Sequence, residues 1–491
     1  MELDEFEPSR ERDHSLESDE DIYQHFSTRR KMLISFVLSY CAFLAPISTT
    51  SILSATNQVN HTFGTTLAIL NVSNAIYLIF MGLSPCFWGP LGDTFARRWI
   101  DPQSPKICLY NAVLFAAFSI GTALAPNFAT SFAFRILTAF SGTTFLVLGA
   151  SAISDVYPPT ERATALGWYL SGTSIGPAIG PVIGGITVTY TSWRAIYWVQ
   201  TGLGSLGTIM LIFGLPETIH RKRSDKLKGL SPKQKARKLC TWGNPLRVIA
   251  IFLYPNLFLV GLASSALVWN MYSLLTPIGH ILNPRFDLNT PLETGLLYLP
   301  PGFGYLVGVH IGGRYADRTV RKWTKIRGFR LPEDRLKSSF ICLGLIIPGS
   351  MLVYGWSLDK EVGGMPLPII SMVVQEMAQL AAFPSLNAYF LDTMQDRASE
   401  ATCQTTYQLP AHYAMRYIIA GISTSICLPI IDASSIGWLS TISSAIMVAC
   451  AIGVVLTANY GAEWRKQRGE KCKATEKNNC DTEGTQFMQE S

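Results

Sequence analysis

Twelve apolar stretches, each about long enough to cross a bilayer as a helix, dominate this 491-residue chain. Only 15% of its residues are charged, whereas roughly 25% is typical of soluble domains. Backbone polar groups must be paired inside a bilayer, so long apolar stretches predict helices. We therefore predict an all-α membrane protein with twelve transmembrane helices, at 32–54, 66–88, 107–125, 130–153, 164–187, 195–215, 247–275, 294–312, 338–356, 366–390, 413–431 and 436–458.

The distribution of Lys and Arg predicts the orientation in the membrane, because cytoplasmic loops retain an excess of basic residues. The segments 221–238 and 314–337 hold nine basic residues each. The alternate loops together hold only Arg285 and Lys360. Both basic segments and both termini should then face the cytoplasm. Because the net charge of +6 follows from this topology, it does not indicate a nucleic-acid partner.

The predicted spans divide into two six-helix bundles, at 32–215 and 247–459, joined by a basic cytoplasmic linker at 216–246. The polar segments 1–31 and 460–491 are predicted cytoplasmic tails, and their composition favours disorder. The first tail lacks the basic start and apolar core of a cleavable signal. Most of the ten cysteines lie singly in the spans and the seven histidines are scattered, so neither a metal site nor a cofactor is expected.

A ten-residue signature follows both the second and the eighth predicted span. GPLGDTFARR begins at Gly89, and GRYADRTVRK begins at Gly313, 224 residues later. A parallel internal duplication of this kind is typical of transporters built from two bundles around a central pathway. Both copies share a glycine, an aspartate and paired basic residues, namely Gly89, Asp93, Arg97 and Arg98, and Gly313, Asp317, Arg321 and Lys322.

These two segments carry a predicted conformational latch. A glycine at position 89 or 313 would permit a sharp turn at the cytoplasmic surface at little steric cost. The carboxylates of Asp93 and Asp317 would pair with guanidinium groups and cap a helix N-terminus in the opposite bundle. Polar loops that only carry positive-inside charge are the alternative, and two copies in register argue against it.

The predicted fifth span contains the run SGTSIGPAIGPVIGG. Four glycines at four-residue spacing form one ridge, at Gly172, Gly176, Gly180 and Gly184. Such a ridge lets a neighbouring helix approach backbone to backbone. Pro177 and Pro181 each remove a backbone hydrogen bond and favour a kink. We therefore predict that this span forms a seam about which the bundles rock.

Two charged residues inside predicted spans are candidates for proton coupling or substrate binding. Arg135 lies about six residues into the fourth span, where an unpaired charge costs at least roughly 2.5 kcal/mol; snorkelling to the outer headgroups is the alternative. Glu376 lies about ten residues into the tenth span and should be paired or protonated. A structural carboxylate held by Gln375 or Gln379 is the alternative there. Positive-inside placement at the cytoplasmic end of the eleventh span explains Arg416.

Several aromatic and amide side chains in the spans are candidates for a solute cavity, because such a mix suits a modest-sized organic compound. They are Trp269, Asn270, Tyr272, Gln379 and Asn387. Separately, Asn60-His61-Thr62 is a glycosylation sequon in the first predicted external loop. Its position agrees with the predicted orientation.

With these motifs the chain resembles the major facilitator superfamily. The repeated signature is similar to that superfamily's hallmark loop, which helps to latch the outward-open state; Arg318 matches a usual basic residue in the second copy, whereas Thr94 departs from it in the first. RILTAFSG, from Arg135, resembles the fourth-helix motif whose arginine is tied to proton coupling. The fifth-span run resembles the motif of the drug and proton antiporters in this superfamily.

The resemblance covers roughly residues 32–459. Within the superfamily, the chain is similar to the fungal twelve-span drug:proton antiporter family, for example in LVWNMYSLLTPIG and FPSLNAYFLD. Two segments, 99–107 and 402–412, are longer than is usual there. The family implies a monomer in the plasma membrane or an internal membrane that exports a drug, secondary metabolite or organic acid, with protons, this small-molecule substrate and membrane lipid as partners.

Three alternatives compete with this interpretation. Uptake or facilitated transport of a sugar, polyamine or carboxylate by the same fold is the first, and the fifth-span motif argues against it. A membrane enzyme is the second, and a receptor or non-transporting sensor is the third. The sequence contains no HExxH, GxSxG or histidine box, and its tails are short and polar.

Overall fold

A computed structural model describes residues 27–94, 107–158, 161–214, 254–288, 290–396 and 408–489, and all regular secondary structure within these ranges is helical. The long helices of the first half are α2 (Thr28–Thr50), α4 (Leu67–Thr94), α5 (Ile107–Ala123), α6 (Phe128–Gly142), α7 (Thr144–Val156), α8 (Arg162–Tyr190) and α9 (Trp193–Gly214). Those of the second half are α12 (Pro255–Leu275), α15 (Leu299–Arg327), α16 (Ile347–Asp359), α17 (Pro366–Asp396), α18 (Gln408–Ala433) and α19 (Ile436–Gln489).

Short helices occupy the connections between these elements. They are η1 (Leu53–Ala55), α3 (Thr56–Phe63), η4 (Ile278–Leu282), α13 (Asn283–Arg285), α14 (Pro291–Leu296), η5 (Pro332–Ser339) and η6 (Cys342–Ile346). Thr290 begins α14 with a capping box, in which its hydroxyl accepts from the Glu293 N–H and the Glu293 carboxylate accepts from the Thr290 N–H.

Each of the twelve predicted spans overlaps a long helix, or two consecutive helices, of the described chain. Nine helical segments in the described ranges are long and apolar enough to cross a bilayer, and α5 is a shorter apolar helix. The glycine-rich α8 and α15, which carries basic residues in its last turn, are not among these nine. The predicted all-α membrane fold is confirmed.

The predicted fourth span is not one continuous helix. It is divided at Thr143, between α6 and α7. The Thr143 hydroxyl donates to the carbonyl oxygen of Ala139 at 2.8 Å, so its side chain bonds back to the preceding turn. The next residue, Thr144, donates to Asn111 on α5 at 3.2 Å, which fixes the start of α7 against a neighbouring helix.

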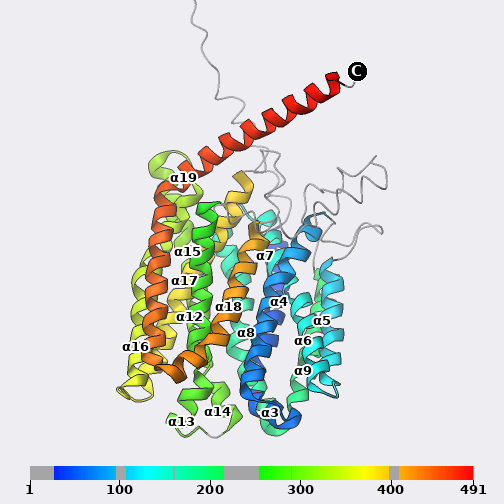
Figure 1. The fold of residues 1–491 in the computed structure, drawn as a ribbon, viewed down its shortest axis with the longest axis vertical. Coiled ribbons are helices and arrows are strands. Elements are labelled where there is room, and N and C mark those ends of the chain that lie inside the picture. Colours follow the sequence, from blue (N-terminus) through cyan, green and yellow to red (C-terminus); the bar gives the residue numbers. More distant parts are fainter. Residues whose placement is uncertain are drawn as a thin grey trace, which may run out of the picture.

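The two halves of the chain lie side by side (Figure 1). They meet along two pairs of helices, α4 with α18 and α8 with α15. The short helices α3, α13 and α14 lie together at one end of the molecule, and α19 emerges from the other end (Figure 1). We call these the α3 end and the α19 end.

The glycine ridge of α8 faces α2 at very close range. A Cβ placed on Gly172 would lie 1.9 Å from the carbonyl oxygen of Ser39, and one on Gly184 would lie 2.0 Å from that of Ser51. Gly176 and Gly180 face Pro46 and Thr50 in the same way. Any larger side chain would therefore push the two helices apart. Pro177 and Pro181 lie inside α8, which continues past them to Tyr190.

The two signature glycines do not form turns, contrary to the expectation from the sequence. Gly89 lies inside α4, where a Cβ would lie 2.5 Å from the Pro410 side chain of α18. Gly313 lies inside α15, where a Cβ would lie 2.8 Å from the carbonyl oxygen of Ala163. The glycines thus permit close packing between the two halves. The turn that ends α15 falls at Gly328, with a φ of 83°.

The tail at 460–491, whose composition favours disorder, is instead helical over most of that range, because α19 continues without a break to Gln489. Other predictions lie outside the described residues. These concern the first tail at 1–26, most of the insertion at 99–107, the linker at 216–246 and the first part of the insertion at 402–412.

Candidate functional site

Asp317 of α15 binds the first turn of α8, which belongs to the other half of the chain. Its Oδ1 accepts from the backbone N–H of Ala163 at 3.3 Å, and its Oδ2 accepts from the N–H of Thr164 at 2.8 Å. The Thr164 hydroxyl also donates to Oδ2, at 2.7 Å. A carboxylate at a helix N-terminus satisfies free N–H groups and complements the helix dipole. The contact expected for Asp317 is therefore present.

Asp392, near the end of α17, gathers three guanidinium groups at the same place. Its carboxylate oxygens lie 2.8 Å from Arg162 Nη1, 3.0 Å from Arg335 Nε and 2.7 Å from Arg330 Nη2. Arg335 also lies 3.0 Å from Asp317 and so bridges the two carboxylates. Because Arg162 begins α8 and Asp392 lies in the second half, this ionic network joins the two halves.

A second set of ion pairs surrounds this network at η5. Arg465 of α19 binds Glu333 with two hydrogen bonds, of 2.8 and 2.7 Å. Arg327 and Lys337 bind Asp334 at 2.9 and 3.1 Å. The Arg465 pair holds the first turns of α19 beyond its apolar part against η5, and bidentate pairing of this kind fixes geometry as well as charge.

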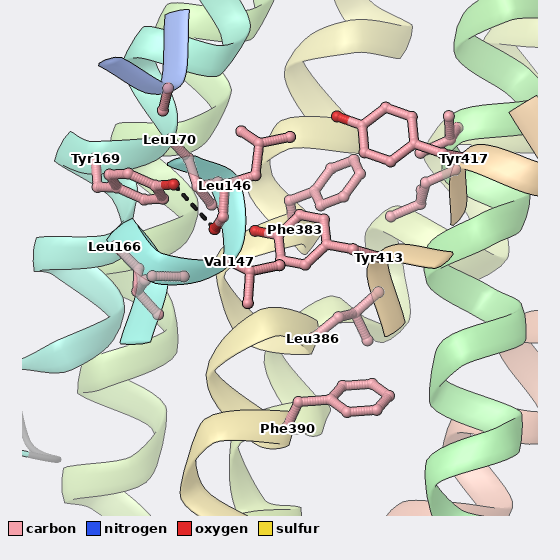
Figure 2. Packing of buried hydrophobic residues seen from close by; sticks show 14 of the residues in the cluster. Leu146, Val147, Leu166, Tyr169, Leu170, Phe383, Leu386, Phe390, Tyr413 and Tyr417 are labelled. Atoms are coloured by element: carbon pink, nitrogen blue, oxygen red, sulfur yellow. Dashed lines mark hydrogen bonds between the residues drawn. The ribbon is translucent and has the colours of Figure 1, made fainter. Parts of the chain in front are cut away.

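An apolar layer lies next to the ionic network, toward the middle of the helices. Leu146 and Val147 of α7 point toward Phe383 of α17 and Tyr413 of α18 (Figure 2). All four side chains are buried. Tyr169 of α8 braces this layer, because its hydroxyl donates to the carbonyl oxygens of Phe145 and Leu146 at 2.9 and 3.0 Å. Apolar side chains from both halves thus separate the interior from the α19 end.

A cavity of about 730 Å³ lies on the opposite side of this layer. Its lining includes His61 and His280, which are exposed at the α3 end, so the cavity reaches the surface there. A smaller pocket of about 60 Å³ lies deeper, and Tyr272 of α12 lines both. Residues from both halves of the chain line each of the two cavities. The interior is therefore open toward the α3 end and closed toward the α19 end.

Two arginines face these spaces. Arg135 of α6 lines the large cavity, donates to Asn74 at 3.2 Å and lies 5.1 Å from the centre of the Tyr77 ring. Arg416 of α18 lines the small pocket and is only 9% exposed. The sequence predicted a position at the cytoplasmic surface for Arg416, but its side chain lies inside the bundle. Helix α18 begins earlier than predicted, at Gln408, so that Arg416 lies about 12 Å along the helix from its start.

Glu376 of α17 is fully buried, and neither of its carboxyl oxygens has a hydrogen-bond partner among the described residues. Gln375 and Gln379 do not hold it, because their side chains also lack partners there. The adjacent Tyr305 of α15 is the polar side chain that interacts with Glu376, and Tyr305 also lines the small pocket. Tyr305 therefore lies between this carboxyl group and the pocket.

The remaining predicted cavity residues lie elsewhere. Trp269 donates to Ser443 of α19 at 2.9 Å, and the Asn387 side chain accepts from His412 at 2.8 Å. Asn270 donates to the Ala266 carbonyl oxygen at 3.0 Å. Of the predicted set, only Tyr272 is among the residues that line the two described cavities; Trp269, Asn270, Gln379 and Asn387 are not.

The other predicted latch residues have varied positions. Arg318 and Arg321 are exposed on α15, and the guanidinium group that pairs with Asp317 is that of Arg335. The backbone of Asp93 is helical, but its side chain lies outside the described part of the chain, as do Arg97 and Arg98. Asn60 is partly exposed in α3. No group of three or more His, Cys, Asp or Glu side chains in the described ranges could hold a metal ion.

Sequence reasoning missed the ionic network that surrounds Asp317, which consists of Arg162, Arg335 and Asp392. Arg162 and Asp392 are charged residues at the ends of apolar spans, and Arg335 lies in a basic segment that positive-inside placement already explained. A carboxylate one turn from the end of an apolar span was the available signal, because such a group needs a partner when it is buried.

The sequence profile of the Major Facilitator Superfamily matches residues 38–406, which is most of the chain. The chain belongs to the Major Facilitator Superfamily. Curated relatives are transporters of the same superfamily. MFS-type transporter phiD from a fungal species (strain ATCC 74256) is 25% identical over 91% of this chain and 71% of its own length. Citrate exporter 1 of Aspergillus niger is 22% identical over 93% of this chain and 91% of its own length. MFS antiporter QDR3 of Candida albicans is 21% identical over 90% of this chain and 79% of its own length.

Solved structures of the superfamily share the fold of this chain. The proton:xylose symporter XylE superposes with a TM-score of 0.65 at 14% identity, over 89% of this chain and 96% of its own. The human organic anion transporter MFSD10 gives 0.63 at 14% identity, over 86% and 99%. Together with the apolar helices, the superfamily match makes this protein a multi-pass membrane transporter, and its relatives are transporters rather than enzymes.

Proposed function

We propose that this superfamily member exports a small organic compound across the plasma membrane in exchange for protons. The observation that carries this proposal is the asymmetry of the interior, which is open at the α3 end and closed at the α19 end. The basic segment 314–337 lies at the α19 end, so the positive-inside rule makes that end cytoplasmic. In this proposal both termini are cytoplasmic, the transporter acts as a single chain, and its interior opens outward.

Alternating access follows from the contacts that close the cytoplasmic end. Arg162, Asp317 and Asp392 hold the two halves together only while the end is closed. An inward-facing state must break these ion pairs and separate Leu146 and Val147 from the second half. Closing the α3 end would supply compensating contacts, and α14 already lies against α8 there. The glycine ridge keeps α2 and α8 together as the halves tilt.

Glu376 is the proposed proton-binding group. Its full burial without a hydrogen-bond partner in the described chain makes an isolated carboxylate costly, so its charge must change with its surroundings. Tyr305 lies between it and the pocket. In the outward-facing state the carboxyl group takes a proton from the outer cavity, and in the inward-facing state it releases that proton to the cytoplasm. The inward proton movement drives the solute outward.

The proposal draws its direction from sequence similarity. The citrate exporter of Aspergillus niger and the antiporter QDR3 of Candida albicans match along most of this chain. The fifth-span motif, whose glycines face α2, is typical of antiporters in the superfamily. Their substrates differ from one another, so the names leave the compound open.

A comparison of cells with and without the gene tests this function. Compounds in the medium are measured at external pH values of about 5 and 7, for cells with the natural protein, no protein or Glu376→Gln. We expect at least one compound whose appearance outside requires the gene and rises at the lower pH. Glu376→Gln, which is neutral and similar in size, should abolish the pH dependence. Net accumulation of the compound inside the cells would instead favour uptake.

A further inference from the structure

Arg416 is a buried cation whose side chain is surrounded by rings. Its guanidinium carbon lies 4.3 Å from the centre of the Phe383 ring, 5.1 Å from that of Tyr413 and 6.0 Å from that of Tyr417. Such cation–π contacts contribute about 0.5–2 kcal/mol each and hold the plane of the guanidinium group in place. They leave its N–H donors, which point along the edge of that plane, to be satisfied by other groups.

Two of those donors lack protein partners in the described part of the chain, and the neutral Tyr413 hydroxyl is the polar group that interacts with the guanidinium group. Nε and Nη1 of Arg416 make no hydrogen bond, and no carboxylate forms an ion pair with Arg416 among the described residues. The buried arginines of the ionic network differ, since both Arg162 and Arg335 bind carboxylates at 2.8–3.0 Å. An unpaired guanidinium group at such a depth is costly, and a carboxylate is the group that best satisfies its fork of donors.

The spaces around Arg416 suit a bound anion. Arg416 lines the small pocket, whose volume of about 60 Å³ has room for a group of a few heavy atoms. Tyr272 lines both this pocket and the cavity of about 730 Å³, so the two spaces are adjacent, and the larger one has room for the rest of a modest-sized compound. Arg135 adds a second positive charge to the wall of the large cavity, and its Nε also lacks a partner in the described chain.

Acidic groups nearby do not cancel these two charges. Glu376 is not among the residues that line either cavity. Asp287 lines the large cavity, but it is an exposed residue at the α3 end, in the turn after α13. The buried charges on the walls of the two spaces are therefore those of Arg135 and Arg416, and buried positive charge in a low-dielectric space attracts anions.

We propose that the transported compound is an organic anion, whose carboxylate binds Arg416 in the small pocket while its organic body occupies the larger cavity. This inference rests on the proposed export function and specifies its substrate class. The flat tyrosine rings of Tyr272 and Tyr417 provide the apolar walls for carbon atoms next to the carboxylate. Arg135 is the first cation that the anion meets on the path from the α3 end.

The charge of the exported compounds tests this proposal. In the comparison of cells with and without the gene, the gene-dependent compounds are identified by mass spectrometry. We expect carboxylates that are ionised at pH 7. Gene-dependent compounds that are neutral or cationic would overturn the anion proposal and leave export intact. If no compound depends on the gene, the export function itself fails, so the two failures are distinguishable.

Binding to the purified full-length protein locates the site. The carboxylate found in this way and its neutral amide are compared as ligands in thermal-unfolding titrations. We expect the carboxylate to bind, Arg416→Gln to weaken it about 10- to 100-fold, and Arg416→Lys to restore part of the affinity. Arg29→Gln, at an exposed arginine on α2, is the matched control. Equal affinity of carboxylate and amide for the natural protein contradicts the proposal even if Arg416→Gln does not fold.

Discussion

The guanidinium group of Arg162 lies 2.8 Å from the carboxylate of Asp392, although 230 residues separate them in the chain. Both side chains are almost completely buried, at 0 and 1% exposure. The pair therefore joins the start of α8 in the first half to the end of α17 in the second. It gives the closed α19 end a charge arrangement that each half alone cannot satisfy.

The two partners should not be equally sensitive to substitution. Arg162→Gln leaves Asp392 paired with Arg330 and Arg335, whereas Asp392→Asn leaves three guanidinium groups around a neutral amide. We expect Asp392→Asn to cost about 3–5 kcal/mol and Arg162→Gln clearly less, because an unpaired buried charge is the larger penalty. Thermal unfolding of the purified variants measures the order. A larger loss for Arg162→Gln would contradict the proposed network.

Asp317→Asn should shift the transporter away from the state that is closed at the α19 end. The amide cannot accept as strongly from the first turn of α8, and Arg335 loses one of its two carboxylates. We expect a shift of at least about 1.5 kcal/mol, or about tenfold in population. A cysteine introduced by Asn71→Cys on the wall of the large cavity measures this shift. When the cavity is open less often, an impermeant thiol reagent added outside should label this cysteine more slowly.

Asp359→Asn is the control for that experiment. Its carboxylate pairs with Lys360, its neighbour in the chain, at 3.5 Å, and so does not join the two halves. Labelling should stay within about twofold of the starting rate. If Asp317→Asn also leaves the rate unchanged, Asp317 does not act as a latch.

The glycine ridge predicts a sharp contrast between two substitutions of the same kind. Gly184→Ala places a methyl group about 2.0 Å from the Ser51 carbonyl oxygen, whereas Gly202→Ala on α9 meets nothing within 4 Å. We expect Gly184→Ala to destabilise the protein by about 1–3 kcal/mol and Gly202→Ala to be neutral or slightly stabilising. Thermal unfolding of the two purified variants compares them directly. Similar stabilities would mean that α2 and α8 separate easily.

The sequence was sufficient for the helices and for Asp317, but not for the contacts that depend on how helices face each other. Apolar length alone predicts the spans, because a bilayer leaves no other way to pair the backbone. Gly89 and Gly313 were assigned to turns because the sequence does not show that Pro410 and Ala163 pack against them. The Arg162 and Asp392 pair required the register of two helices from different halves.

Arg416 illustrates the same limit. Because Arg416 is close to the predicted start of its span, it was expected at the membrane surface. Helix α18 begins earlier, at Gln408, so Arg416 lies deeper in the bundle. A shift of about five residues moves a side chain by about 7.5 Å along a helix and to another face. Single-sequence hydropathy does not locate helix ends that well, because polar residues near the ends of a span still lie inside the bundle.

Arg465 should hold the start of the part of α19 that extends beyond its apolar segment. Its two hydrogen bonds to Glu333 are largely shielded from solvent, with side-chain exposures of 15 and 3%. Arg465→Gln removes a bidentate charged pair, so we expect amide hydrogen exchange in η5 and the adjacent turns of α19 to rise about tenfold. Lys466→Gln, at the exposed neighbouring position, should leave exchange unchanged. Equal exchange in both variants would show that the pair does not order this region.

Alternating access itself is tested most directly by two distances measured in the same protein. Spin labels at Glu161 and Lys325 report the cytoplasmic end, and labels at His61 and Asp432 report the outer end; all four positions are exposed. Pulsed electron paramagnetic resonance in lipid nanodiscs measures the distance within each pair of labels at low and high pH, with Glu376→Gln as a comparison. We predict that the cytoplasmic distance lengthens as the outer distance shortens. Two distances that change in the same direction, or a cytoplasmic distance that never changes, would contradict the account.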